Sequence, residues 1–212
     1  MSRKSKLLKQ YAVLLFVFSG LQCCTSASGL VQSSSGIFQN RILNPASNQI
    51  SEKPETGNRV VLIGVISDTH GLLRPKAVRA LRGSQLILHA GDVGNPEILD
   101  ELRRIAPVVA VRGNIDRDSW AERLPDFEVV EAGGLQIYML HNLDLLDLEP
   151  AAAGFSAVVF GHSHRPGQKR RKGVLYLNPG SAGPRRFHLP VSIGRLKIAD
   201  GKIRGQIVRL SY

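Results

Sequence analysis

The residues of this 212-residue chain that are best suited to chemistry occur in five separate groups, each directly after a short apolar run. They are carboxylates, imidazoles and one amide, and none of them is a thiol. Such oxygen and nitrogen donors suit first-row divalent cations, such as Mn²⁺, Fe²⁺, Co²⁺, Ni²⁺ and Zn²⁺. The candidate metal ligands, in chain order, are Asp68, His70, Asp92, Asn114, His141, His162 and His164.

The apolar runs before these groups are predicted to be β-strands buried on both faces, because they are rich in β-branched and aliphatic residues. We expect such strands over 59–66, 86–89, 107–111 and 157–160, and a similar run over 174–177 is predicted to be a further strand. Helices are expected between the early strands, over 75–82 and 96–104, and both open with proline. Alternating strands and helices favour parallel pairing, which brings the carboxyl ends of the strands, and the polar groups, to one sheet edge.

Later in the chain the pattern favours antiparallel structure. The segments 128–130 and 135–140 flank two glycines and are predicted to form a hairpin. The segments 191–198 and 203–210 flank Asp200-Gly201 and predict a second hairpin. An α/β fold with a sandwich of two sheets follows more naturally than a single doubly wound sheet.

Each polar group taken alone has a plainer explanation. Asp68 could cap a helix, Asn114 could be a turn residue, and His141 could be a half-buried histidine that binds nothing. His162 and His164 are a stronger signal, because alternate residues of an extended segment project the same way. Since the plainer explanations would have to hold independently at five strand ends, we favour one shared site.

The number of donors indicates how many ions the shared site would hold. Seven donors are too many for one catalytic ion that keeps an open coordination position. They suit two ions that share one carboxylate, as in binuclear hydrolases. Two divalent cations would bind a phosphate group and convert a bridging water into a hydroxide nucleophile.

The order Asp-x-His, Gly-Asp, Gly-Asn-x-Asp, His and Gly-His-x-His resembles the calcineurin-like metallophosphoesterase superfamily. Asn178-Pro179-Gly180-Ser181, followed by Pro184-Arg185, is similar to its small YfcE-type phosphodiesterase branch. The resemblance covers about residues 59–210 and implies a four-layer αββα sandwich, in which helices flank two mixed β-sheets.

The resemblance also implies roles for the seven residues. One ion would be held by Asp68, His70, Asp92 and His164, and the other by Asp92, Asn114, His141 and His162. Asp92 would bridge the ions, and Asn114 would also help to stabilise charge on phosphorus. We expect two divalent ions, foremost Mn²⁺, with Ni²⁺, Fe²⁺, Co²⁺ and Zn²⁺ as alternatives.

The implied function is a binuclear phosphoesterase, foremost a phosphodiesterase that acts on small phosphate diesters. Nucleotides and nucleic acid are left open as substrates, and a homo-oligomer is left open as the assembly. The alternatives are a phosphomonoesterase of the same fold and a non-catalytic scaffold, since the eukaryotic retromer contains a subunit with this fold. All seven ligand positions are filled here, which favours an enzyme.

The chain departs from the wider superfamily at Ile115. Larger members carry histidine at this position of Gly-Asn-x-Asp, where it is thought to protonate the leaving group, and the small branch commonly lacks it. Isoleucine has no proton to give, which argues against efficient hydrolysis of phosphomonoesters. A second departure is Asn142 after His141, where the small branch usually has glycine.

Composition limits the class of protein. Hydrophobic residues make up 43% and charged residues 21%, which argues against wholesale disorder and against a polytopic membrane protein. Lys and Arg total 28 against 17 Asp and Glu, and the net charge of +11 favours anionic partners. The only cysteines are Cys23 and Cys24, so thiolate zinc sites and a cysteine nucleophile are excluded from residue 25 onward.

The first 57 residues differ from the rest. Residues 1–27 resemble a secretory signal, with a basic start and an apolar run over 11–21 that is too short for a stable membrane span. Residues 28–57 are predicted to be a flexible linker, and 58–212 the metallophosphoesterase domain. The signal-like segment suggests export or membrane anchoring, whereas the family resemblance suggests the cytoplasm. A mis-called start upstream of a cytosolic chain is the alternative.

A basic stretch follows the last histidine pair, with Arg165 and the run 169–172. It is interpreted first as a solvated hairpin turn. The alternative is a cationic rim that attracts a polyanionic substrate, to which Arg185 and Arg186 would add. No aromatic residues interleave with these charges, so the stacking platform of a single-strand nucleic-acid binder is not expected.

Overall fold

The computed structural model of the chain describes residues 60–186 and 188–210. The predicted signal-like segment 1–27 and linker 28–57 lie outside these residues, so export and anchoring stay predictions. Within the two described ranges, no helix is long and apolar enough to cross a membrane.

The first sheet contains the strands that precede three of the five polar groups. Its strand order is β10-β9-β1-β2-β3. β1, β2 and β3 are parallel, β9 pairs with the other side of β1 in antiparallel fashion, and β10 is antiparallel to β9. The bounds are Val61–Ile66 for β1, Leu86–His89 for β2, Val108–Ala110 for β3, Ser192–Ala199 for β9 and Lys202–Arg209 for β10.

The second sheet contains the strands that precede His141 and the His162–His164 segment. Its strand order is β4-β5-β6-β8-β7, with a parallel centre and an antiparallel strand at each edge. The bounds are Phe127–Ala132 for β4, Leu135–Leu140 for β5, Ala157–Val159 for β6, Gly167–Arg171 for β7 and Val174–Asn178 for β8. Both sheets are therefore mixed.

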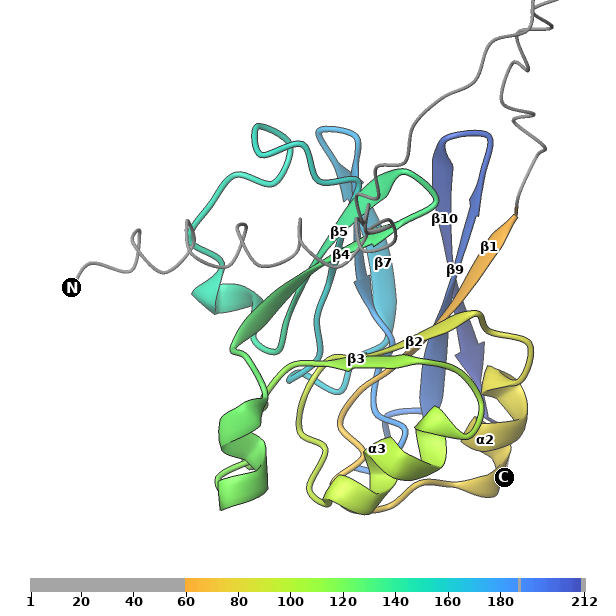
Figure 1. Cartoon of the computed structure of the whole chain (residues 1–212), viewed down its shortest axis with the longest axis vertical. Helices are drawn as coiled ribbons and strands as arrows, with labels where there is room; N and C mark the ends of the chain where they lie inside the picture. Colours follow the sequence, from red (N-terminus) through yellow and green to blue (C-terminus); the bar gives the residue numbers. More distant parts are fainter. Residues whose placement is uncertain (1–59, 187, 211–212) are drawn as a thin grey trace, which may run out of the picture. The chain divides into compact units, whose positions relative to one another are not determined.

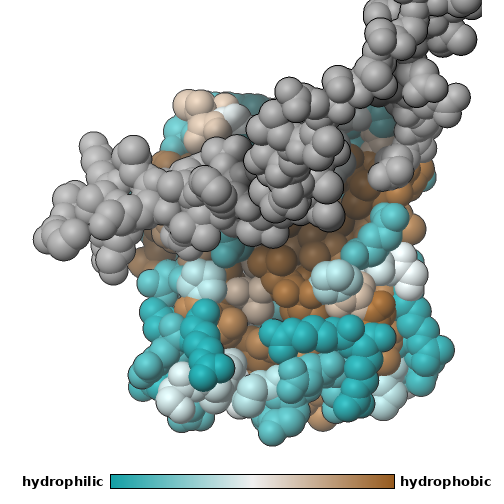
Figure 2. Space-filling model, viewed as in Figure 1, coloured by the Kyte–Doolittle hydropathy of each residue, from teal (hydrophilic) through white to brown (hydrophobic). Residues whose placement is uncertain are grey.

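The sheets pack face to face around an apolar core that includes Ile63, Leu88, Met139 and Leu177. Helices α2, Pro75–Leu81, and α3, Pro96–Arg103, cover the outer face of the first sheet (Figure 1). Figure 2 shows mainly hydrophilic residues where these helices face the viewer, as amphipathic helices require. The predicted sandwich of two mixed sheets is confirmed.

The layer on the outer face of the second sheet is mostly irregular. Tyr138, Val158 and Tyr176 on that face pack against Leu146 and Phe155 of the chain between β5 and β6. Two short 3₁₀ helices complete the described elements. They are η1, Ser119–Arg123, and η2, Leu143–Leu145.

Strand β7 was not predicted as a strand, because its sequence is polar. Four of its five residues are exposed, and it pairs only with β8. Charged side chains on an edge strand discourage pairing with another chain. The basic run thus forms a strand, followed by a turn at Lys172 and Gly173.

A chain that begins at Asn58 is expected to fold and to unfold within a few degrees of the full-length protein. The reason is that β1, the central strand of the first sheet, begins at Val61. Thermal unfolding of the two proteins checks this. A chain that begins at Gly64 removes half of β1 and should be insoluble. Insolubility of the longer chain as well would contradict the domain boundary at 58.

Candidate metal centre

Five of the predicted ligands have a left-handed backbone, in loops just beyond strand ends. Their φ angles are 53° at Asp68, 47° at His70, 55° at Asp92, 68° at His162 and 57° at His164. Residues other than glycine rarely adopt this conformation, which costs about 1–3 kcal/mol each and concentrates at functional sites. The surrounding structure therefore holds these loops in place against local strain.

The extended conformation assumed for His162 and His164 was wrong. The segment turns sharply, with the Ser163 N–H donating to the Gly161 carbonyl at 2.8 Å, and the two rings meet different neighbours. His164 is buried and stacks on His70 at 5.1 Å between ring centroids. His162 is exposed and meets the ring of His141 edge-on at 5.2 Å. The pair is thus divided between two halves of the site.

The first half contains Asp68, His70, Asp92 and His164, whose ligand atoms lie within 4.8 Å of one another. The Nε2 atoms of His70 and His164 are 3.3 Å apart. His164 Nε2 is 3.3 Å from Asp68 Oδ1, and His70 Nε2 is 3.8 Å from Asp92 Oδ2. These four residues form a candidate metal site.

The second half lies around the other oxygen of Asp92. His141 Nε2 is 3.4 Å from Asp92 Oδ1, and its Nδ1 lies 2.7 Å from the carbonyl of Ala90. Because a carbonyl only accepts, Nδ1 carries a proton and donates it there, as metal-bound histidines commonly do. Asn114 Nδ2 lies 3.4 Å from His162 Nδ1. The structure thus brings all seven predicted residues to one edge, with Asp92 between the halves.

Buried polar atoms without hydrogen bonds show that this donor set suits a cation. Among the described residues, Asp68 Oδ1 and His141 Nε2 are such atoms, and both face the centre. An unsatisfied buried polar atom costs about 1–3 kcal/mol. A divalent ion in each half of the site, bound by oxygen and nitrogen, would satisfy these two atoms, so the residues fit the metals that the sequence predicts.

The protonation states of the site residues also favour a bound cation. Burial raises the pKa of Asp68 to about 7, against the hydrogen bond from Ser67. Burial also raises the pKa of Asp92, but contacts with His141 and the N–H of Ile115 outweigh it and bring it to about 2. Burial, supported by the charge of Arg186, lowers the pKa of His164 to about 4. The His164 imidazole is therefore neutral near pH 7, with a lone pair free for a cation.

Metal-free Asp68→Asn protein is expected to be more stable than metal-free wild type at pH 8. The folded-state pKa of about 7 lies above the ordinary 3.8, so ionising Asp68 destabilises the folded state as pH rises between these values. The full cost is up to about 4 kcal/mol, at 1.36 kcal/mol per pKa unit. Asparagine keeps the shape and cannot ionise.

Urea unfolding of the chelator-treated proteins at pH 4.5 and pH 8 measures this difference. It should be large at pH 8 and small at pH 4.5. Asp126→Asn, which changes an exposed carboxylate, is the control and should show no such pH dependence. A variant less stable than wild type at pH 8 would mean that Asp68 is not an uncompensated charge.

Asp116 positions the site and was not among the predicted site residues. Its buried carboxylate accepts hydrogen bonds from the backbone N–H groups of Val93 at 3.1 Å, Gly94 at 2.8 Å and Gly113 at 2.8 Å. It therefore ties the loop after β2 to the loop after β3. Asp116 could have been identified from the sequence, because it is the acidic residue of the Gly-Asn-x-Asp motif.

Two glycines of the motifs are required by close packing. A Cβ atom on Gly113 would lie 2.0 Å from the backbone nitrogen of Asp92, and one on Gly161 would lie 2.0 Å from Ser67 Oγ. Any side chain at either position would displace a loop that carries a candidate ligand. The glycines before Asn114 and His162 therefore allow the loops to meet.

His89 helps to hold the loop that carries Asp68 and His70. It is fully buried, and its Nε2–H donates to Thr69 Oγ1 at 2.9 Å, because that hydroxyl donates in turn to the Val93 carbonyl. Thr69 lies between Asp68 and His70 in sequence, so His89 helps to hold the segment that carries two candidate ligands. Its place just before Ala-Gly-Asp was the only signal in the sequence.

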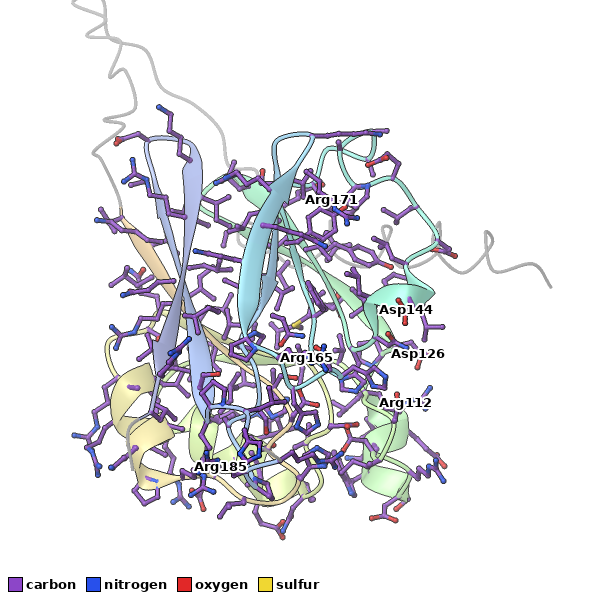
Figure 3. All side chains as sticks on the ribbon, turned by 180° about the vertical axis from the view of Figure 1, so that it is seen from behind. Arg112, Asp126, Asp144, Arg165, Arg171 and Arg185 are labelled. Atoms are coloured by element: carbon purple, nitrogen blue, oxygen red, sulfur yellow. The ribbon has the colours of Figure 1, made fainter. Side chains whose placement is uncertain are left out.

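The basic residues divide between the site and the distant end of β7. Figure 3 shows Arg171 far from Arg165 and Arg185. Lys172 pairs with Glu149 at 2.7 Å, away from the centre, so the run 169–172 does not form the cationic rim. Arg186 does lie at the centre, with Nη2 3.5 Å from His70 Nε2.

Residues 61–201 match the calcineurin-like phosphoesterase superfamily domain. The fold and the cluster of candidate metal ligands agree with that match, and the chain belongs to this family of metallophosphoesterases.

Named relatives share this family. The chain is 37% identical over 164 residues to a probable metallophosphoesterase of Methanothermobacter thermautotrophicus. The alignment covers 70% of this chain and 92% of that protein. The chain is 26% identical over 137 residues to a phosphodiesterase of Methanocaldococcus jannaschii, covering 56% and 82%. The structure of Vps29 from Entamoeba histolytica complexed with Zn²⁺ is similar in fold, with a TM-score of 0.55, 22% identity and coverage of 71% and 100%.

Proposed function

We propose that this metallophosphoesterase is a phosphodiesterase that works with two divalent ions, foremost Mn²⁺. The observation that carries the proposal is the position of Asp92. Its Oδ2 faces His70 and its Oδ1 faces His141, so one carboxylate lies between two groups of nitrogen donors. That arrangement suits a carboxylate shared by two ions.

The residues divide between the ions as the family resemblance implies. Asp68, His70, Asp92 and His164 would hold one ion, and Asp92, Asn114, His141 and His162 the other. When bound, the ions would supply positive charge for the phosphate group and acidify the attacking water.

The chain's own groups have further tasks. The Ile115 N–H donates to Asp92 Oδ1 at 3.0 Å and fixes the orientation of this carboxylate. The exposed amide of Asn114 can donate to a phosphate oxygen as charge develops there. Arg186 adds a positive charge beside His70, which favours an anionic substrate.

Ile115 favours diesters with good leaving groups over monoesters, because the site lacks an acid at this position. The relative that is named a phosphodiesterase supports diesters as the substrate class. A phosphomonoesterase of this fold is the second candidate, and small nucleotides belong among the substrates to be tested. The complete donor set supports an enzyme over a non-catalytic scaffold.

The deciding experiment measures metal content and hydrolysis together. Full-length protein loaded with Mn²⁺ should contain two ions per chain by elemental analysis. It should hydrolyse bis(p-nitrophenyl) phosphate faster than p-nitrophenyl phosphate. The control is His188→Ala, which changes an exposed histidine and should leave both results unchanged. One ion per chain would contradict the binuclear site, and preference for the monoester would favour the second candidate.

A further inference from the structure

A cationic hollow lies on the outer face of the first sheet, between the C-terminal end of α2 and strands β9 and β10. Its volume is about 340 Å³, within the usual range of small-molecule sites. Four cationic side chains line it, and none of its lining residues is acidic. These side chains are Arg82, Arg195, Lys197 and Arg204.

The cationic hollow is separate from the metal centre. Leu62, which lines it, lies near the start of β1, and Asp68 follows the end of that strand. At about 3.3 Å per residue, the stretch from Leu62 to Ile66 alone spans about 13 Å. A ligand in the hollow would therefore leave the metal centre uncovered.

Strand register places two of the cations side by side. Lys197 of β9 lies directly opposite Arg204 of β10, and Leu62 of β1 lies opposite Lys197 on its other side. Their neighbours Leu196 and Ile203 belong to the core between the sheets, so these three side chains share the outer face. Like charges directly opposite each other destabilise a sheet, and this pair therefore needs an explanation.

No carboxylate neutralises the pair. The side chains of Arg82, Lys197 and Arg204 have no hydrogen-bond or ion-pair partner among the described residues. Arg195 is anchored, because its Nη2 donates to the Ala80 carbonyl at 2.6 Å. Figure 3 shows many nitrogen-tipped side chains along α2 and the outer sides of β9 and β10. The positive charge is thus concentrated and free to bind an anion.

An apolar surface adjoins these charges. Leu62 is 44% exposed, and Val60, which alternation places on the same face, is 38% exposed. An inorganic anion would leave this surface in water, whereas an organic group attached to the anion would cover it.

We propose that the cationic hollow is a second ligand site, which binds an organic oligophosphate of the size of a nucleoside triphosphate. The phosphates would lie against Arg82, Lys197 and Arg204, and the organic part against Leu62 and Val60. The site has no metal ligands and no part in hydrolysis, so it does not depend on the function proposed for the metal centre.

Binding is measured by calorimetry on full-length protein that has been freed of metal and then dialysed, with ATP, inorganic tripolyphosphate and adenosine as probes. ATP should bind most tightly and tripolyphosphate more weakly, while adenosine should not bind. Lys197→Gln with Arg204→Gln should weaken ATP binding at least tenfold. Leu62→Ser should weaken binding of ATP and leave that of tripolyphosphate unchanged.

The matched control is Lys202→Gln with Arg209→Gln. This variant also removes two positive charges, but from residues of β10 that do not line the hollow, and it should change ATP affinity less than threefold. The Lys197 and Arg204 double variant should also melt at or above the wild-type temperature, because a repulsive pair is gone. Its metal-loaded diester hydrolysis should match wild type. The proposal is overturned if neither phosphate probe binds, or if both double variants weaken binding equally.

Discussion

Replacing Asp92 by alanine is expected to remove both metal ions and to lower diester hydrolysis at least about 10³-fold. Such a loss corresponds to about 4 kcal/mol of transition-state stabilisation. The reason is geometric, since each oxygen of Asp92 faces a different group of nitrogen donors, at 3.8 Å from His70 and 3.4 Å from His141. No other described carboxylate lies between both groups.

Two further variants separate a binuclear site from a single ion. His164→Ala should remove the ion of the first half, and His141→Ala the ion of the second, so each variant should retain one ion per chain by elemental analysis. Asp100→Ala, on the exposed side of α3, is the control and should retain two. If His141→Ala had the metal content of wild type, the second ion would not exist.

The rate of hydrolysis is expected to fall steeply as the leaving group becomes more basic. A positioned acid typically contributes 10²–10⁴-fold, and Ile115 cannot supply a proton. Ile115 is 44% exposed, and its N–H donates to Asp92 Oδ1, so it lies at the mouth of the site. Aryl diesters, whose leaving groups need no proton, should therefore be cleaved about 10²–10⁴-fold faster than alkyl diesters.

Ile115→His should raise the rate on alkyl diesters at least about tenfold and that on aryl diesters much less. The gain should stay at the lower end, because Asp116 is not free to orient the new ring. Its oxygens already accept three backbone N–H groups. Ile115→Asn, which is polar but offers no comparable acid, is the control. A shallow dependence on the leaving group in wild type would show that another residue supplies the proton.

The sequence allowed the buried strands and the clustering of the candidate ligands to be predicted, for physical reasons that particular elements illustrate. β2 was predicted with its observed bounds, because a β-branched and aliphatic run of that length is typical of a strand buried on both faces. Asn95 and Pro96 marked the start of α3, and Asn95 does accept from the Glu97 N–H. Strand β7 could not be predicted in this way, since its exposed edge position requires no apolar pattern.

The orientation of the ligands could not be predicted, because tertiary contacts impose it. The left-handed conformation of Asp92 depends on a loop that Asp116 holds from another strand end. Likewise, His89 supports Thr69 through a hydrogen bond between residues far apart in sequence. Local sequence carries no record of such contacts, so it predicted which residues would meet but not how His162 and His164 would separate.

The left-handed backbone of five candidate ligands has an evolutionary consequence. Glycine would relieve the strain at each position, and neutral residues would relieve the buried charge of Asp68. Some changes that remove a candidate ligand, such as Asp68→Asn, therefore stabilise the folded chain, so selection for the site is needed to keep these residues. A lineage that stopped using the site would gain stability by losing Asp68, so the first step from enzyme to scaffold would be downhill in free energy for this fold.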